Sequence, residues 1–249
     1  MAALSGVTKD VKQGAAQPLH WREHPEDVTD PRTEFRLDRI LAQPLKLYFG
    51  LTGQALLNRS TGLLEQVRLG AHYLDRLPSQ LSGGEKQRVA VARAFAAQPE
   101  LVLCDEITSA LDVSVQAAVL ELLDDLRRDN DTSYIFVSHD LAVVKALSDR
   151  VAVLYQGRLC ELGPTKDVYG PILHPYTEVL LGAVLEPDPD FTPTLEASDV
   201  VELSPPERGC PFQRRCPKRM GSVCEEIAPP CREFSDGHVI WCHREDLGG

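Results

Sequence analysis

The segment Leu81–Arg88, with the sequence LSGGEKQR, carries two adjacent glycines just before an apolar-periodic stretch. Ser82 and Glu85 are three residues apart, which is the spacing of a capping box at a helix N-terminus. Free backbone N–H groups at a helix start attract anionic oxygens, and glycines let a ligand approach the backbone closely. The segment therefore predicts a capped helix, with or without a phosphate site at its start.

Two adjacent carboxylates, Asp105 and Glu106, follow the apolar run 101–104. A carboxylate at the C-terminal end of a buried strand can hold Mg²⁺, while its neighbour positions an attacking water. A strand that ends at a solvated turn would explain the same residues. Asp112 has the position of an ordinary helix N-cap, and a lone histidine such as His139, just after an apolar run, is usually structural. Taken singly, neither of these residues indicates chemistry.

Short apolar runs alternate with amphipathic stretches in the middle of the chain, and this alternation predicts the elements that position these side chains. The expected strands cover 101–104, 134–137, 151–155 and 158–162, and Gln156-Gly157 is the predicted turn between the last two. The helix between the first two strands would present one apolar face, made of Val115, Val119, Leu122 and Leu126. Leucine spacing predicts an earlier helix over 56–69. The pattern indicates an α/β domain with a mostly parallel sheet.

The chain has 249 residues, of which 37 are acidic and 26 are Lys or Arg, so its net charge is −11. The length is sufficient for one globular domain with an appendage, or for two small domains. An acidic balance argues against binding to a phosphate backbone, which excludes nucleic acid as a principal partner. No uncharged apolar run reaches the roughly 18–20 residues of a membrane span, and the N-terminus lacks the pattern of a secretory signal. We therefore expect a soluble, cytosolic protein.

The seven cysteines are concentrated at the end of the chain. Five of them fall in the last forty residues: Cys210, Cys216, Cys224, Cys231 and Cys242. Disulfides are disfavoured in a reducing cytosol, so such a cluster favours metal binding. A stretch rich in Pro, Asp and Glu begins near residue 186 and is typical of a linker.

Four motifs, in their order and spacing, resemble those of the ATPase subunits of ABC transporters. LSGGE is similar to the signature loop, LVLCDE to the Walker B strand, SALD to the D-loop, and His139 to the switch histidine. The resemblance implies Mg-ATP as the cofactor. It further implies that Asp105 serves Mg²⁺, that Glu106 orients or activates the hydrolytic water, and that His139 contacts the γ-phosphate.

The resemblance also implies a second ATPase subunit. The signature-loop residues Ser82, Gly83, Gly84 and Gln87 would contact ATP that is held by this partner, and Asp112 of the D-loop would signal across the interface. The implied fold class is α/β, an incomplete P-loop-type ABC ATPase domain with a small Cys-rich C-terminal appendage. The implied parts are a remnant of the N-terminal and helical region (1–80), the ATPase core (81–170) and a C-terminal extension (171–249).

The phosphate-binding loop G-x-x-x-x-G-K-[ST] does not occur in this sequence, because none of its seven lysines follows a glycine. Glu23 takes the place of the family's Q-loop glutamine, and Ile107 replaces the proline usual after the Walker B glutamate. Without the loop, phosphates lose most of their positioning and charge stabilisation. We therefore expect at most half of a composite ATPase, which relies on a partner with an intact Walker A. A truncated gene or a misassigned start is the alternative.

The motif His174-Pro175-Tyr176-Thr177 and the Cys-rich tail together resemble the ATPase subunits of oligopeptide/dipeptide-type importers. In the tail, Cys210, Cys216, Cys224 and Cys242 have the spacing C-x5-C-x7-C-x17-C. Some relatives are reported to bind a four-iron–four-sulfur cluster there, so the resemblance implies an iron–sulfur cluster held by these four thiolates. The absence of a C-x2-C pair disfavours zinc, although zinc and no metal both stay open.

These inferences lead to one principal hypothesis. The chain would be the ATP-binding subunit of an ABC importer for peptides or similar small solutes, peripheral on the inner face of the plasma membrane. Its partners would be a second ATPase subunit and transmembrane permease subunits, which must recruit it because an acidic protein does not adhere to anionic lipid. The alternative is a catalytically inert regulatory or interaction module with a metal-binding tail.

Overall fold

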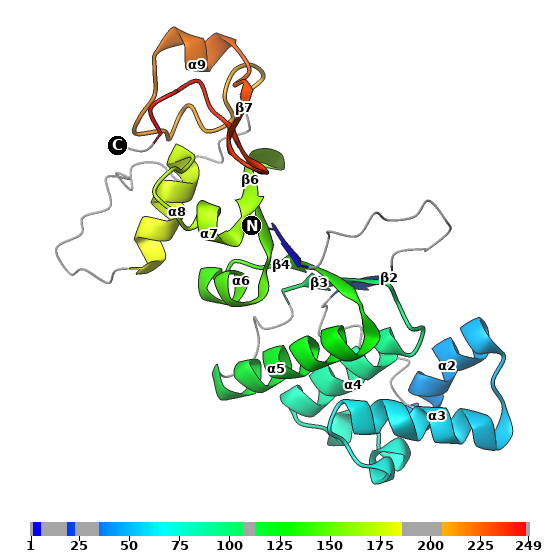
Figure 1. The fold of residues 1–249 in the computed structure, drawn as a ribbon. Helices are drawn as coiled ribbons and strands as arrows, with labels where there is room; N and C mark the ends of the chain where they lie inside the picture. The colour runs from blue at the N-terminus through cyan, green and yellow to red at the C-terminus, as the bar shows by residue number, and fades with distance from the viewer. Residues whose placement is uncertain (1, 6–18, 23–34, 107–112, 186–205, 248–249) are drawn as a thin grey trace. The chain divides into compact units, whose positions relative to one another are not determined.

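A computed structural model describes residues 2–5, 19–22, 35–106, 113–185 and 206–247 (Figure 1). The chain divides into two compact units. One consists of residues 6–137, and the other of residues 1–5 together with 138–249. Nowhere in the described ranges is a helix both long enough and apolar enough to cross a membrane.

The first unit contains a helical part that precedes the signature segment. Helix α2 (Leu37–Phe49) buries Leu37, Leu41 and Leu45, which recur every four residues and so share one face. Gly50, with φ of 63°, ends this helix in a left-handed conformation and donates its N–H to the carbonyl of Lys46. The sequence did not predict α2, whose pattern contains Pro44.

Helix α3 (Gly53–Gln66) is the helix predicted over 56–69, and it buries Leu63 and Leu64. It ends earlier than predicted because Arg68 takes a left-handed φ of 59°, which a helix cannot continue through. Two short 3₁₀ helices follow, η1 (Ala71–Asp75) and η2 (Pro78–Gln80). They lead directly into α4 (Gly83–Phe95), the helix of the signature segment.

A parallel sheet completes the first unit. Its strands are β2 (Leu19–Arg22), β3 (Leu101–Asp105) and β4 (Ser133–Val137), and β3 lies between the other two. Asp105 pairs with Val137 in the register of β3 and β4. The long helix α5 (Val113–Asn130) connects these two strands, as predicted, and buries Val119, Leu122 and Leu126. The parallel crossover of an α/β domain is thereby confirmed.

The second unit is built on an antiparallel sheet in the order β1-β5-β6-β8-β7. The strands are β1 (Ala2–Ser5), β5 (Arg150–Tyr155), β6 (Arg158–Pro164), β7 (Cys231–Ser235) and β8 (His238–Trp241). The predicted two-residue turn joins β5 and β6, with positive φ at both Gln156 (48°) and Gly157 (77°). The helices are α6 (Leu141–Leu147), α7 (Thr165–Val168), α8 (Pro175–Leu185) and α9 (Ser222–Glu226). The sequence did not predict β7 and β8, because they are short and lie within the cysteine segment.

Candidate functional site

The signature segment forms a capping box at the start of α4. The hydroxyl oxygen of Ser82 accepts a hydrogen bond from the Glu85 N–H at 3.4 Å, and Glu85 Oε2 accepts one from the Ser82 N–H at 2.7 Å. Ser82 itself is extended, with φ of −66° and ψ of 163°, as an N-cap residue must be. The predicted capped helix is therefore confirmed.

The two glycines of the segment have different surroundings. A Cβ on Gly83 would meet nothing within 4 Å, whereas a Cβ on Gly84 would lie 2.7 Å from Val115 Cγ1 of α5. Gly84 is thus required by the close approach of α5, while Gly83 and Ser82 are exposed. Gln87, further along α4, is buried with 9% of its surface exposed. Only the first part of the predicted signature set presents itself to a ligand from outside.

The Glu85 carboxylate is strongly stabilised in its charged form. A hydrogen bond from the Tyr73 hydroxyl is the largest cause, followed by the bonds to the backbone and side chain of Ser82, and together they lower the pKa of Glu85 to about 2. The same pairing raises the pKa of Tyr73. At neutral pH the loop therefore holds an anionic Glu85 and a neutral, donating Tyr73.

The predicted acidic pair lies where β3 ends. Asp105 is the last residue of the strand, and Glu106 follows it with an exposed side chain and a left-handed φ of 49°. The Glu106 N–H donates to the carbonyl of Val137 at 2.8 Å, so the turn begins while the chain is still tied to β4. Asp105 thus ends the strand, and the backbone turns sharply at Glu106.

His139 belongs to the second unit, two residues after β4 ends. Its neighbours fix the loop: Asp140 caps α6 by accepting the N–H groups of Ala142 and Val143 at 3.0 and 3.2 Å. Ser138 Oγ accepts the Asp140 N–H at 3.0 Å. The His139 side chain is exposed. Asp112, Glu23 and Ile107 lie outside the described residues.

The cysteine segment folds around aromatic rings. Cys210 and Cys224 are buried with Tyr155 and Phe212, whose ring centroids are 5.1 Å apart, and Cys216 packs against this group. The Cys210 N–H donates to the carbonyl of Cys224 at 2.8 Å. Gly209 permits this approach, because a Cβ there would lie 2.3 Å from the Cys224 carbonyl oxygen. The segment Gly209-Cys210 is thus fixed against the turn that carries Cys224.

Three of the four predicted ligand cysteines are held as neutral thiols. Burial raises the pKa of Cys210, of Cys242 and, to about 11, of Cys216. Backbone hydrogen bonds from Phe212, Lys218 and Arg244 oppose these shifts, and the Met220 N–H points at Cys224 Sγ from 3.5 Å. Within the described ranges, however, no three His, Cys, Asp or Glu side chains are grouped so that they could hold a metal ion. The predicted iron–sulfur cluster, and likewise zinc, therefore has no support from the structure.

A buried carboxylate that the sequence did not predict organises the HPYT motif at 174–177. Glu161 of β6 is fully buried, and its Oε2 accepts the His174 N–H at 2.9 Å and the Thr177 hydroxyl at 2.5 Å. Its Oε1 lies 2.8 Å from Nε2 of the equally buried His238 on β8. One side chain thus joins the start of α8 to two strands. The available signal was a charged residue inside the apolar run of β6.

His174 and Tyr176 complete this arrangement. His174 Nδ1 accepts the Tyr176 N–H at 3.0 Å, so the imidazole caps the start of α8. Burial lowers the pKa of His174 to about 4, partly opposed by a hydrogen bond to the Trp241 backbone, and the ring is neutral at pH 7. Tyr176 packs against Tyr155 with ring centroids 4.8 Å apart. The motif therefore connects β6, α8 and the aromatic group around the cysteines.

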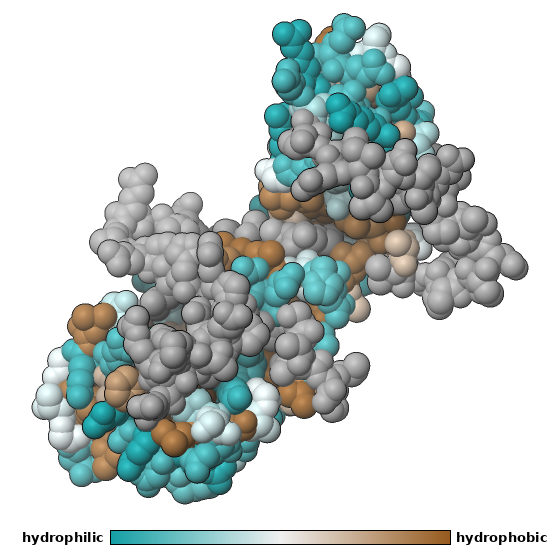
Figure 2. All heavy atoms as spheres, turned by 180° about the vertical axis from the view of Figure 1, so that it is seen from behind, coloured by the Kyte–Doolittle hydropathy of each residue, from teal (hydrophilic) through white to brown (hydrophobic). Residues whose placement is uncertain are grey.

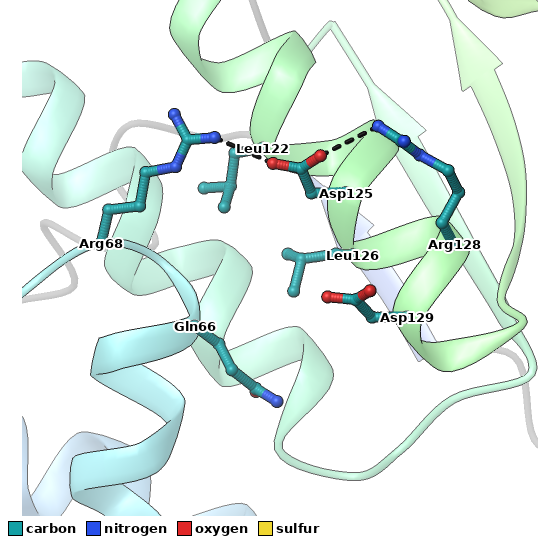
Figure 3. A pocket seen from close by; sticks show the side chains of 7 residues that line it. All are labelled: Gln66, Arg68, Leu122, Asp125, Leu126, Arg128 and Asp129. Atoms are coloured by element: carbon teal, nitrogen blue, oxygen red, sulfur yellow. Dashed lines mark hydrogen bonds and ion pairs between the residues drawn. The ribbon is translucent and has the colours of Figure 1, made fainter.

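A cavity of about 200 Å³ lies between the end of α3 and α5 in the first unit (Figure 3). Asp125 stands between two guanidinium groups, Arg68 Nη2 at 2.8 Å and Arg128 Nη2 at 2.9 Å. The positive and negative charges that line the cavity therefore compensate one another. None of the predicted site residues lines the cavity. The lining residues are Gln66, Arg68, Leu122, Asp125, Leu126, Arg128 and Asp129.

Comparison with known proteins agrees with the motifs. The ABC transporter family matches residues 21–109, and the C-terminal region of the oligopeptide/dipeptide transporter family matches residues 160–224. The oligopeptide transport ATP-binding protein OppF of Salmonella typhimurium is 40% identical over 240 residues, which cover 91% of this chain and 71% of that protein. The chain belongs to the ABC transporter ATP-binding proteins of the oligopeptide/dipeptide type. OppF of Escherichia coli is similar to it at 39% identity over 247 residues, with 92% and 72% covered.

The fold of this ABC family member has a counterpart among solved structures. A metal-chelate type ABC transporter in an inward-facing conformation aligns with a TM-score of 0.52 at 27% identity, over 60% of this chain and 58% of that one. The predicted α/β class is thus confirmed. The predicted family is confirmed as well, including the place of the HPYT motif inside the matched C-terminal region.

Proposed function

We propose that this chain is the ATP-binding subunit of a peptide importer and that its signature loop completes the ATP site of a second ATPase subunit. The observation that carries the proposal is the start of α4, where an exposed Ser82 and an exposed, unobstructed Gly83 stand at a capped helix N-terminus. Backbone N–H groups and a hydroxyl in this arrangement suit the γ-phosphate oxygens of a nucleotide. The names of the OppF relatives, oligopeptide transport ATP-binding proteins, support the transport of peptides.

The remaining predicted roles follow from family membership. When Mg-ATP is bound, Asp105 would serve Mg²⁺, Glu106 would orient the hydrolytic water, and His139 would contact the γ-phosphate. Two adjacent carboxylates at the end of a strand fit these two roles, because one can hold Mg²⁺ while the other positions a water. Asp112 would signal across the interface between the two ATPase subunits. Gln87 is predicted to contact the partner's ATP with the signature loop, but only 9% of its surface is exposed, so the proposal leaves this role out.

Permease subunits are the second class of partner. Within the described parts of the first unit, apolar side chains are exposed at the end of α2 and on α3, including Leu47 (75% exposed), Phe49 and Leu57. Figure 2 shows such apolar surface in separate patches on an otherwise mostly hydrophilic lobe. Apolar side chains rimmed by polar ones suit a protein partner. A permease would then hold the acidic chain at the membrane face.

The decisive experiment is complementation. We would co-express the chain with a peptide-importer ATPase subunit that carries GxxxxGK[ST], purify the pair, and measure Mg-ATP hydrolysis. The pair should hydrolyse ATP faster than either subunit alone, and Ser82→Arg should abolish the gain because an arginine fills the approach to the helix start. Ser222→Arg, at an exposed position of α9, is the matched control and should keep the gain.

Two outcomes would contradict the proposal. No gain from the wild-type chain would favour the inert regulatory module, and a gain that survives Ser82→Arg would remove the signature loop from the reaction. Calorimetric titration of the chain alone with Mg-ATP is the companion measurement. Micromolar binding without a partner would mean that another segment of this chain holds phosphate, which the proposal does not include.

Metal binding by the tail remains a separate proposal. It rests on the spacing of the four cysteines and on the resemblance to oligopeptide/dipeptide-type ATPase subunits. Anaerobic purification with iron, sulfide and zinc assays tests it, with Cys231→Ser as the control that removes a cysteine outside the ligand set. Iron and sulfide in equal amounts would support a cluster, and stoichiometric zinc would support a zinc site. Protein that contains neither iron–sulfur nor zinc would refute both kinds of site.

A further inference from the structure

Tyr73 lies nine residues before the signature serine and is absent from every motif of the sequence. It is part of the 3₁₀ helix η1, and its hydroxyl donates to Glu85 Oε1 at 2.5 Å. The other carboxylate oxygen, Oε2, accepts the Ser82 N–H at 2.7 Å. Glu85 therefore uses one oxygen for η1 and one for the loop, which fixes both its rotation and the loop it caps.

The tyrosine is itself held from two sides. The Arg76 guanidinium lies 4.1 Å above the centre of its ring, and the His72 ring is 4.7 Å away, centre to centre. The Tyr73 N–H donates to the carbonyl of Gly70 at 3.0 Å. The cation over the ring face and the backbone hydrogen bond to the nearby Gly70 limit the directions in which the Tyr73 hydroxyl can point. Tyr73 thus acts from a fixed support.

The consequence concerns the orientation of Ser82. Its hydroxyl oxygen accepts a long hydrogen bond of 3.4 Å from the Glu85 N–H, and the Ser82 side chain is one of the groups that stabilise the charged Glu85 carboxylate. Both the backbone N–H and the side chain of Ser82 therefore take their orientation from Glu85. The hydrogen bond from Tyr73 is the largest of the interactions that stabilise the negative charge of Glu85, which would lie beside an incoming phosphate.

We propose that Tyr73 is a positioning residue of the signature loop, acting through Glu85 to aim Ser82 at the γ-phosphate of ATP in the partner subunit. The inference rests on the proposed function for its reaction, and on the geometry of η1 and α4 for its mechanism. This role predicts a dependence on the nucleotide: loss of Tyr73 should weaken the use of ATP, which has a γ-phosphate, and should leave the binding of ADP unchanged.

The test uses Tyr73→Phe, which removes one hydroxyl, in the complemented ATPase pair. We expect kcat/KM for ATP to fall about tenfold, the worth of one hydrogen bond to a charged group, while the affinity for ADP is unchanged. In a Glu85→Gln background the same substitution should have a much smaller effect, because its target is altered. Tyr48→Phe, at a half-exposed tyrosine of α2, is the matched control.

A second measurement needs no partner and no activity. Hydrogen exchange of the Ser82 amide should be about tenfold faster in Tyr73→Phe than in the wild type, because its acceptor is no longer held. Equal exchange would overturn the positioning role, and equal kcat/KM in a pair that Ser82→Arg inactivates would overturn the link to ATP. A wild-type pair without activity would refute the proposed function instead, and the exchange result would still decide the role of Tyr73.

Discussion

Two glutamates illustrate how differently this chain uses a carboxylate. Glu85 lies at the partly exposed start of α4 and binds one backbone N–H and one tyrosine hydroxyl. Glu161 is fully buried in β6 and binds a backbone N–H, a threonine hydroxyl and an imidazole. The first network fixes the conformation of one loop, and water can replace much of it. The second holds α8 and β8 against β6, and nothing can replace it in a dry interior.

The largest effect is expected at the buried network. Glu161→Ala leaves the His174 N–H, the Thr177 hydroxyl and the His238 ring without their acceptor, so the unfolding free energy should fall by about 3–5 kcal/mol. Urea unfolding followed by circular dichroism measures it. Glu226→Ala, at an exposed position of α9, is the control and should change the value by less than about 0.5 kcal/mol. A loss below about 1 kcal/mol at Glu161 would show that the buried and exposed networks do not differ.

The next effect sharpens the comparison through pH. Burial lowers the pKa of His174 from 6.5 to about 4, so between these values the unfolded chain binds a proton that the folded chain does not. The unfolding free energy should therefore decrease as the pH falls from 6.5 to 4, by about 3 kcal/mol from this residue alone. Above pH 6.5 the contribution is constant.

His174→Asn, which keeps a capping side chain without a titrating ring, should show a smaller pH dependence than the wild type over that window. Urea unfolding at several pH values gives the difference between the two proteins. The exposed His72, replaced in the same way, serves as the control whose pH dependence should match the wild type. Identical curves for His174→Asn and the wild type would mean that His174 is accessible to protons in the folded state.

The smallest effect is expected where the charges are most exposed. Arg68 pairs with Glu121 and Asp125 on the surface at 3.2 and 2.8 Å, and surface ion pairs of this kind contribute little. Arg68→Ala should leave the urea midpoint unchanged. Arg232→Ala should lower the urea midpoint more than Arg68→Ala does. The Arg232 guanidinium is half-buried and donates to the carbonyls of His243 and Arg244 at 3.0 Å. A midpoint that falls more for Arg68 than for Arg232 would reverse the order of the two networks.

The elements that the sequence predicted well are those defined by local patterns. The strands at 101–104 and 134–137, the helix between them and the turn at Gln156-Gly157 each follow from apolar spacing or turn chemistry, and the structure confirms them as β3, β4, α5 and the β5–β6 turn. The Ser82–Glu85 cap is local as well. Their boundaries differ where a single residue departs from the pattern, as Arg68 does at the end of α3.

What escaped prediction depends on partners distant in the chain. Glu161 meets His174 across 13 residues and His238 across 77, and no spacing rule connects them. Tyr73 and Glu85 are only 12 residues apart, yet a 3₁₀ helix and a turn separate them, so their meeting follows from tertiary structure. The metal prediction rested on composition and resemblance, and cysteine count alone does not determine how side chains converge.

The left-handed backbone at Glu106 has a consequence for how this position evolves. An L-residue at φ of 49° carries a conformational cost of about 1 kcal/mol that glycine avoids. Replacement by glycine would relieve this conformational cost and would remove a carboxylate from the end of β3. Under the proposed function, the strained backbone at this position is kept for the carboxylate that orients the hydrolytic water. If that proposal holds, the residue at position 106 is a record of whether a lineage still hydrolyses nucleotide.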